Sequence, residues 1–407
     1  MEIRPTTDQD HEVFVDTMHT AFGLFPDTPA EDGGGVWWSA LEMERGLLAL
    51  AEDGRPVGTA ASYSFELTLP GGALVPVGGV TAVGVVPSHR RRGVLSAMMR
   101  HQLTELRARG DFLSVLLASE ATIYGRFGYG PATCTQRLTV PRRQAALAVP
   151  RALGTVGGAD TGSVEVLRRA DCAELLEEVY DRYRRAQPGA LSRPHRWWAR
   201  RAGQPPIAPA PRYVAVHRDA DGIPDGYASY AIGDDRTLTV DETIAADDAV
   251  FTALARFVLE HDLVGTVVLK HVPPEHPLRW QLADLRAGEV GSPGDWLWVR
   301  LLDVPGALTA RGWFADGELV LDVVDPFLGE HGRHLLTVRD GGAECVPTDR
   351  EPDLSLDVRD LGAVYLGGTA PSTLVRAGHV RAHRPDAAAR ADALFRGERP
   401  PHCLHWF

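Results

Sequence analysis

Residues 83–95 (VGVVPSHRRRGVL) constrain the fold of this chain more than any other segment. A β-branched run ends before Pro87, a basic turn with Gly93 follows, and apolar residues then recur at helical spacing from Leu95 to Leu106. A strand that leads through a turn into a helix is typical of mixed α/β proteins. Such a turn aims backbone N–H groups and the positive end of the helix dipole at one point. It therefore predicts an anion site, with a solvated basic helix start as the alternative.

Composition narrows the class of protein. The chain has 407 residues, which is more than one average domain needs, and 44% of them are hydrophobic, as in folded soluble proteins. The formal net charge of −12 disfavours nucleic acid and anionic lipid as partners. The four cysteines are too scattered for a disulfide framework, which predicts reduced thiols. The start MEIRPTTDQDHEVF is no signal peptide, and no run of about 18 apolar residues occurs. We therefore expect a cytoplasmic protein without membrane insertion.

Periodicity and composition predict three consecutive domains, at 1–148, 149–300 and 301–407, in a chain of the α/β (α+β) class. A stretch rich in Ala, Pro and Gly at 141–164 is typical of a linker between the first two domains. The second domain repeats the order of the first, but it lacks a glycine-containing anion turn, so we expect it to have lost the ligand site. The individual elements predicted are helices at 11–22, 94–109, 171–185, 247–262, 360–368 and 386–395, antiparallel strands within 47–86, a buried strand at 112–118, and alternating strands from 318 to 360.

Two motifs carry a resemblance to a known family. RRRGVL at 90–95 and ASEATIYGRFGYGPAT at 118–133 resemble the Eis (enhanced intracellular survival) group of GCN5-related N-acetyltransferases. The resemblance implies two tandem acetyltransferase folds, a sterol-carrier-protein-like domain at 301–407, and acetyl-CoA as co-substrate. It places the cofactor site at Val83, Val85, Arg90, Arg91, Gly93, Val94 and Ser119. Leu95 departs from the Gly or Ala of the general cofactor-loop pattern.

The resemblance also implies catalytic roles, with Tyr124 as general acid and the carboxylate of Phe407 as general base. A phenol with an ordinary pKa of about 10 keeps its proton at neutral pH and can give it to a departing thiolate. A terminal carboxylate with a pKa of about 3.5 is a weak base in water, and burial would strengthen it. The alternatives are a core tyrosine, a frayed chain end, and His405 as the group that takes the proton. The spacing of His402 and His405 matches no tetrahedral ligand set, so we expect no metal.

The acceptor is expected to be a small polycationic amine, with aminoglycosides as the class that the resemblance implies, and antibiotic resistance as the consequence. The resemblance places the amine pocket in the stretch with Phe25, Asp27, Trp37 and Trp38. Aromatic and acidic side chains suit a polyamine, although the two tryptophans fit core packing equally well. The rival functions are acetylation of a protein lysine or N-terminus, and a non-catalytic lipid carrier or scaffold. The resemblance further implies a homohexamer.

Overall fold

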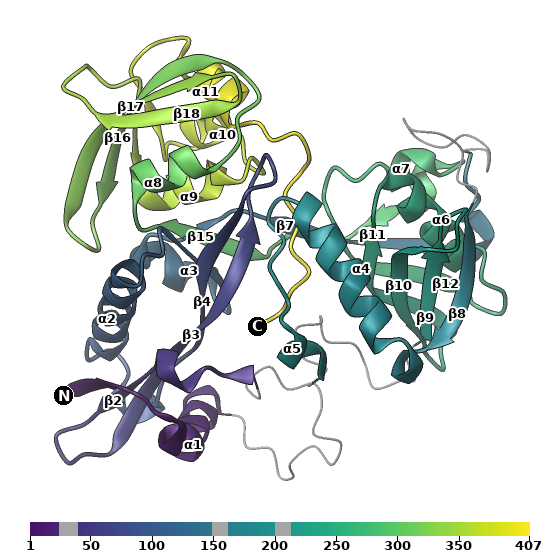
Figure 1. Cartoon of the computed structure of the whole chain (residues 1–407), viewed down its shortest axis with the longest axis horizontal. Coiled ribbons are helices and arrows are strands. Elements are labelled where there is room, and N and C mark those ends of the chain that lie inside the picture. Colours follow the sequence, from purple (N-terminus) through teal and green to yellow (C-terminus); the bar gives the residue numbers. More distant parts are fainter. Residues whose placement is uncertain (24–39, 149–161, 200–212) are drawn as a thin grey trace.

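The computed structural model describes residues 1–23, 40–148, 162–199 and 213–407. Figure 1 shows three bodies, each built on its own β-sheet: a first domain in purple and blue, a second in teal beside it, and a third in green to yellow. The C-terminus lies between the first two bodies and not at the outer surface. This arrangement confirms the predicted mixed α/β class.

The first sheet has seven strands within the described residues. They run in the order β1 (Glu2–Pro5), β2 (Gly46–Leu50), β3 (Pro56–Thr68), β4 (Leu74–Val85), β5 (Leu113–Leu117), β15 (Leu297–Leu301) and β6 (Gly130–Pro131). β3 and β4 form the long antiparallel hairpin that the alternating apolar residues predict. The tip of this hairpin uses Gly71 and Gly72 at φ 85° and 84°, which glycine alone adopts without strain.

Two of the strands cross the predicted domain boundaries. β15 follows the second domain in the sequence, yet it returns to the first sheet and pairs with β5 and β6. In exchange, β7 (Cys134–Pro141) leaves the first domain and pairs with β12 of the second sheet. Each of the first two sheets therefore contains a strand from a distant part of the sequence: β15 in the first sheet and β7 in the second.

Among the described residues, the second sheet has eight strands and the third has five. The described part of the second runs β13 (Glu289–Val290), β7, β12 (Thr266–Val272), β11 (Thr237–Ala245), β10 (Pro224–Ile232), β9 (Tyr213–Arg218) and β8 (Ser163–Arg168), with β14 (Gly294–Asp295) also paired to β7. The third runs β18 (Gly342–Pro347), β17 (Glu330–Arg339), β16 (Gly317–Asp325), β19 (Leu354–Asp357) and β20 (Arg381–Ala382).

Helices cover these sheets; in the described residues the six predicted helices begin within two residues of the expected positions, whereas five short ones, with four to seven residues each, were not predicted. They are α1 (His11–Phe22), α2 (Val94–Ala108), α3 (Ala121–Tyr124), α4 (Ala173–Ala186), α5 (His195–Ala199), α6 (Asp248–Leu259), α7 (Leu278–Gln281), α8 (Val304–Ala310), α9 (Val358–Tyr365), α10 (Pro371–Arg376) and α11 (Ala387–Phe395). No helix among the described residues is long and apolar enough to cross a membrane.

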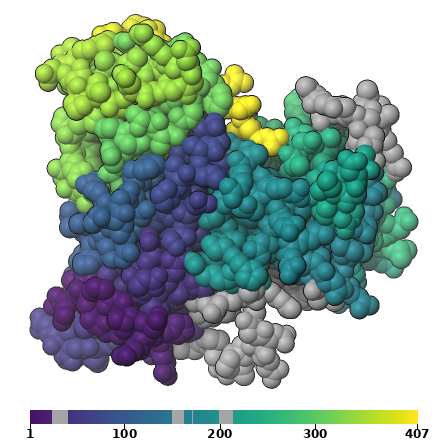
Figure 2. Space-filling view, in the orientation of Figure 1, coloured from purple at the N-terminus to yellow at the C-terminus, as the bar shows by residue number. Residues whose placement is uncertain are grey.

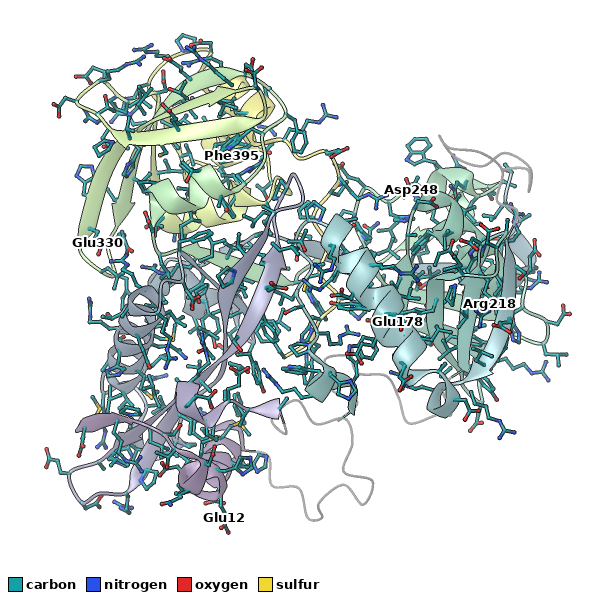
Figure 3. All side chains as sticks on the ribbon, viewed as in Figure 1. Glu12, Glu178, Arg218, Asp248, Glu330 and Phe395 are labelled. Carbon is teal, nitrogen blue, oxygen red and sulfur yellow. The ribbon has the colours of Figure 1, made fainter. Side chains whose placement is uncertain are left out.

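The third domain docks on the first through α9, which lies on β15 and β6. Two glycines make the close approach possible. A Cβ at Gly362 would lie 2.2 Å from the carbonyl oxygen of Val299, and a Cβ at Gly130 would lie 1.9 Å from that of Arg359. The buried guanidinium of Arg300 joins the same region, because it donates to the carbonyl of Phe127 and to the carboxylate of Asp325. Figure 3 shows Glu330 at the edge of the third domain, where its carboxylate accepts a 2.6 Å hydrogen bond from Arg107 of α2.

Gly362→Ala tests whether the close contact between α9 and β15 requires a residue without a side chain. Helix propensity alone would stabilise the protein by roughly 1 kcal/mol, whereas the overlap with the Val299 carbonyl should cost about 1–3 kcal/mol as overpacking. We expect the overlap to dominate and the urea midpoint of unfolding to fall. The control is Gly294→Ala, where nothing lies within 4 Å of the added Cβ, and an equal loss in both variants would contradict this account of the interface.

Candidate active site

A cleft opens in the first domain where two parallel strands diverge. β4 and β5 pair from Gly78 with Ser114 to Val80 with Leu116, and no pairing is found beyond that point. Ala82 in β4 has φ 51°, and the pairing of β4 with β3 shifts register there, so the strand carries a β-bulge. The Thr59 hydroxyl donates to the Ala82 carbonyl at 2.8 Å and holds the bulge. The bulge turns the following residues, Val83 to Val85, along the cleft.

The basic turn between β4 and α2 closes one end of the cleft. Arg91 and Gly93 adopt φ 62° and 82°, so two residues of the turn have a left-handed backbone conformation before α2 begins at Val94. The N–H groups of the first turn of a helix have no acceptor within the helix, and here they face the turn without a capping side chain. The turn therefore offers several free donors to an anion.

All seven residues predicted for the cofactor site line one hollow of about 690 Å³. Its lining includes the ends of α1, β4 and α2, the turn, and the start of α3, with Val83, Val85, Arg90, Arg91, Gly93, Val94, Ser119, Glu120 and Ile123 among the residues. The two arginines differ in what they do. Arg90 donates to the carbonyls of Val85 at 3.2 Å and Ala21 at 2.8 Å, so its guanidinium holds the end of α1 to the turn. The side chain of Arg91 is exposed.

Tyr124 lies at the end of α3, behind the residues that line the cleft. Its side chain is buried and packs edge-on against Tyr129, with ring centroids 6.3 Å apart. Burial raises the pKa of the Tyr124 phenol, and a hydrogen bond with Ser119 opposes part of that rise. The phenol is therefore protonated at neutral pH and contacts a residue of the cleft.

The C-terminal segment, residues 401–407, leaves the third domain and inserts between the other two. Figure 2 shows it in yellow, passing from the third domain toward the second before other atoms cover it. The backbone N–H of His402 donates to Pro188 at 2.8 Å, and Trp296 donates to the His405 carbonyl at 3.4 Å. Only Trp406 of this segment is not fully buried.

Aromatic rings surround the last residue. The Phe407 ring lies 5.1 Å from that of Phe65 and 6.3 Å from that of Tyr63, both on β3, and it comes within 3.2 Å of the position of a Cβ at Gly79 on β4. His405 lies between Phe65 and Trp197, and burial lowers its pKa well below the ordinary value. The structure thus brings Phe407 to the strand that also carries Val83 and Val85.

Some predicted residues cannot be placed, and one feature was missed. Phe25, Asp27, Trp37 and Trp38 lie outside the described residues. The bulge at Ala82 has no signal in the sequence, because an alanine in a run of small and β-branched residues matches an ordinary strand. Among the described residues, no group of three or more His, Cys, Asp or Glu side chains is arranged to hold a metal ion.

Comparison with known proteins defines the class. Residues 2–132 and 189–301 each match a family model described as an acetyltransferase (GNAT) domain, and residues 304–404 match a sterol carrier protein domain. The tandem acetyltransferase folds and the sterol-carrier-like domain that the motifs imply are therefore confirmed. The protein is an N-acetyltransferase of the GNAT class, whose fold implies acetyl-CoA as co-substrate.

Full-length relatives define the family. The chain is 35% identical over 378 residues to N-acetyltransferase Eis of Mycobacterium tuberculosis, which covers 89% of this chain and 90% of the relative. It is 36% identical over 416 residues to an uncharacterized N-acetyltransferase of Streptomyces griseus, with 99% of both chains covered. The crystal structure of Eis1 from Mycobacterium abscessus matches with a TM-score of 0.86 at 35% identity over 100% of both chains. The chain belongs to the Eis family of N-acetyltransferases.

Proposed function

We propose that this enzyme transfers the acetyl group of acetyl-CoA directly to an amine of a polycationic acceptor, with aminoglycosides as the acceptor class. One observation carries the proposal: the seven residues that the motifs assign to the cofactor line a single cleft, with Tyr124 behind it and Phe407 against the same strand. A decayed scaffold has no physical reason to keep free N–H donors, an exposed arginine and a buried phenol around one hollow.

The turn fits the diphosphate of CoA. A cofactor phosphate needs close approach to backbone N–H groups, and a Cβ at Gly93 would meet nothing within 4 Å, so the turn is open to a ligand. Arg91 adds charge at the same place, while Val83 and Val85 offer main-chain groups to the pantetheine arm. When bound, acetyl-CoA supplies an acetyl thioester, whose C–S bond breaks as the new C–N bond forms.

Proton movement falls to two groups of this chain. The carboxylate of Phe407 takes one proton from the acceptor's ammonium and passes it to solvent, which frees the lone pair for attack. Tyr124 gives its proton to the departing sulfur, and the second proton lost by the nitrogen restores the phenol. Burial favours these assignments over His405, since it strengthens a carboxylate as a base but weakens an imidazole.

An acidic groove supports a cationic acceptor. A hollow of about 440 Å³ between β3 and α4 is lined by Glu66, Glu177 and Asp181. The guanidinium groups in its wall are buried and paired, Arg184 with Glu66 and Asp181, and Arg193 with Glu242, so mainly carboxylates of the wall face the solvent. Asp181 also pairs with Arg185, and Glu177 with His195, each at 2.8 Å. Phe65 also lines the groove and contacts Phe407, which connects the groove to the proposed base.

Two further features complete the proposal: the assembly rests on the family resemblance, and the location rests on the scattered cysteines. We propose that the chain assembles as a homohexamer and works in the cytoplasm. Light scattering at micromolar concentration tests the assembly.

Arg91→Glu should weaken acetyl-CoA binding at least tenfold, or about 1.4 kcal/mol, because it places a like charge beside the diphosphate. The matched control is Arg92→Glu, which makes the same charge change at a residue that does not line the cleft. Calorimetry should show a clearly smaller effect for the control. An equal loss of acetyl-CoA affinity in both variants would mean that only the total positive charge of the turn favours binding, and not the position of Arg91 in the cleft.

Tyr124→Phe should keep acetyl-CoA affinity and lower kcat by roughly 10²–10⁴-fold, the usual contribution of a positioned acid. The matched control is Tyr129→Phe, which removes a buried phenol bonded to Ser114 at 2.7 Å. That variant should lose stability but keep kcat within a few-fold. Normal turnover of Tyr124→Phe at saturating substrates would make Tyr124 a packing residue.

A short extension after Phe407 should abolish acetyl transfer, because it displaces the carboxylate and forces extra backbone into a closed space. The same extension before Met1 is the control and should be harmless. Binding of acetyl-CoA should survive in both proteins, since the turn lies in the first domain. A C-terminally extended enzyme with normal turnover would place the base elsewhere.

The acceptor class is tested by mass spectrometry after incubation with acetyl-CoA and an aminoglycoside, spermidine or a lysine-containing peptide. We expect the aminoglycoside to be acetylated fastest. Glu177→Gln should raise its KM about three- to tenfold with little change in kcat, because a groove carboxylate is lost. The neighbouring Glu178→Gln faces solvent and should change neither constant. Preferential acetylation of the peptide would replace the aminoglycoside proposal by protein acetylation.

A further inference from the structure

The second acetyltransferase fold opens at the same place as the first. β11 and β12 pair in parallel from Thr237 with Thr266 to Val240 with Leu269, and no parallel pairing follows. A hollow of about 120 Å³ lies at this divergence, and we call it the second-domain cavity. Its wall is built from α4, β11, α6, the segment after β12 and the C-terminal segment, and includes Tyr183, Gln187, Thr243, Ala245, Asp247, Asp248, Phe251, His271, Glu275, His276, Arg399 and His402.

This cavity cannot take the diphosphate that the first domain is built for. The connection from β11 to α6 is only Ala246 and Asp247, against the longer basic turn of the first domain. The carboxylate of Asp247 caps the helix, because it accepts from the N–H groups of Ala249 at 2.8 Å and Val250 at 2.9 Å. The donors that would bind an anion are therefore already satisfied by an acid of the protein itself.

The charge of the cavity is negative. Asp247, Asp248 and Glu275 line it, and the one guanidinium in its wall, that of Arg399, is paired with Asp248 at 3.1 Å. Figure 3 shows Asp248 at the start of α6, on the side of the second domain toward the third. The histidines add no positive charge at neutral pH, since burial lowers the pKa of His271 and His276 to about 4 and that of His402 to about 3.

Polar atoms without partners line the cavity. The Nδ1 atom of His402, whose side chain is 5% exposed, has no hydrogen-bond partner in the described part of the chain, and neither ring nitrogen of His271 has one. A buried neutral imidazole left without partners costs free energy, and a ligand with N–H donors would recover it. Tyr183 and Phe251 supply aromatic surface beside these atoms, and the Phe251 ring lies 4.0 Å from that of His276.

We propose that the second-domain cavity binds a ring-sized organic cation, an ammonium group carried on a compact apolar ring. Cavities of roughly 150 Å³ hold benzene in other proteins, so a hollow of about 120 Å³ limits the enclosed part of the ligand to one small ring. The ammonium donates to the carboxylates and to an imidazole nitrogen that carries no hydrogen, and the ring contacts Tyr183 and Phe251. His402 belongs to the C-terminal segment and Arg399 lies just before it, so the ligand stabilises that segment in its docked position.

The test is calorimetric titration of the full-length protein with three probes of one size: benzylammonium, benzyl alcohol and benzoate. We expect benzylammonium to bind at least tenfold more tightly than benzyl alcohol and benzoate not to bind. The acidic groove between β3 and α4 also attracts cations. Binding in the second-domain cavity is therefore measured as the part of the heat that is lost in Ala245→Leu, a substitution that fills this cavity. In that variant acetyl-CoA binding should be unchanged, since its site lies in the first domain.

A second variant keeps the proposal testable if Ala245→Leu does not fold. Asp247→Asn combined with Glu275→Gln keeps a helix cap and removes two charges, so benzylammonium affinity should fall about tenfold while benzyl alcohol affinity holds. Glu174→Gln, an exposed site on α4 outside the cavity, is the matched control and should change nothing. Equal affinity for the three probes, or heat unaffected by the cavity variants, would overturn the proposal. Neither result depends on acetyl transfer, so the proposed function stands or falls separately.

Discussion

The pairing of β15 with the first sheet is the constraint on which the rest of the structure depends. Five residues that follow the whole second domain return to lie between β5 and β6. This return closes a loop of about 160 residues, and the main-chain hydrogen bonds of a central strand must offset the entropy of that closure. It also sets the start of the third domain beside the turn that follows Tyr124, because Arg300 joins Phe127 of this turn to Asp325.

The same constraint explains how a C-terminal residue can reach a site in the first domain. The third domain is fixed on β15 and β6 through the close contacts at Gly130 and Gly362. The segment after α11 then needs only a short path to the aromatic cluster at Phe65, Trp197 and Phe407. A loosely tethered third domain would deliver this segment only part of the time, because its conformational entropy would oppose insertion.

Most of the architecture was predictable from local signals, whereas the long-range pairing was not. The β3–β4 hairpin and helices α1, α2, α4 and α6 follow from apolar periodicity and turn residues. The exchange of β7 and β15 between sheets leaves no local signal, since a strand's sequence records its burial but not its partner. At the site, the residues that the motifs assign to the cofactor do line one cleft. The hydrogen bond from Arg90 to the Ala21 carbonyl could not be predicted, because it depends on where α1 ends.

The two acetyltransferase folds show how one short connection determines what a fold can bind. In both, two parallel strands diverge and a helix follows the first of them. In the first domain the connection is long and basic, contains Arg91 and Gly93 at positive φ, and leaves the N–H groups at the start of α2 free. In the second it is reduced to two residues, and Asp247 satisfies the same groups with its own carboxylate. A carboxylate at this place repels a diphosphate and attracts a cation, so loss of one ligand class and gain of another follow from the same residue.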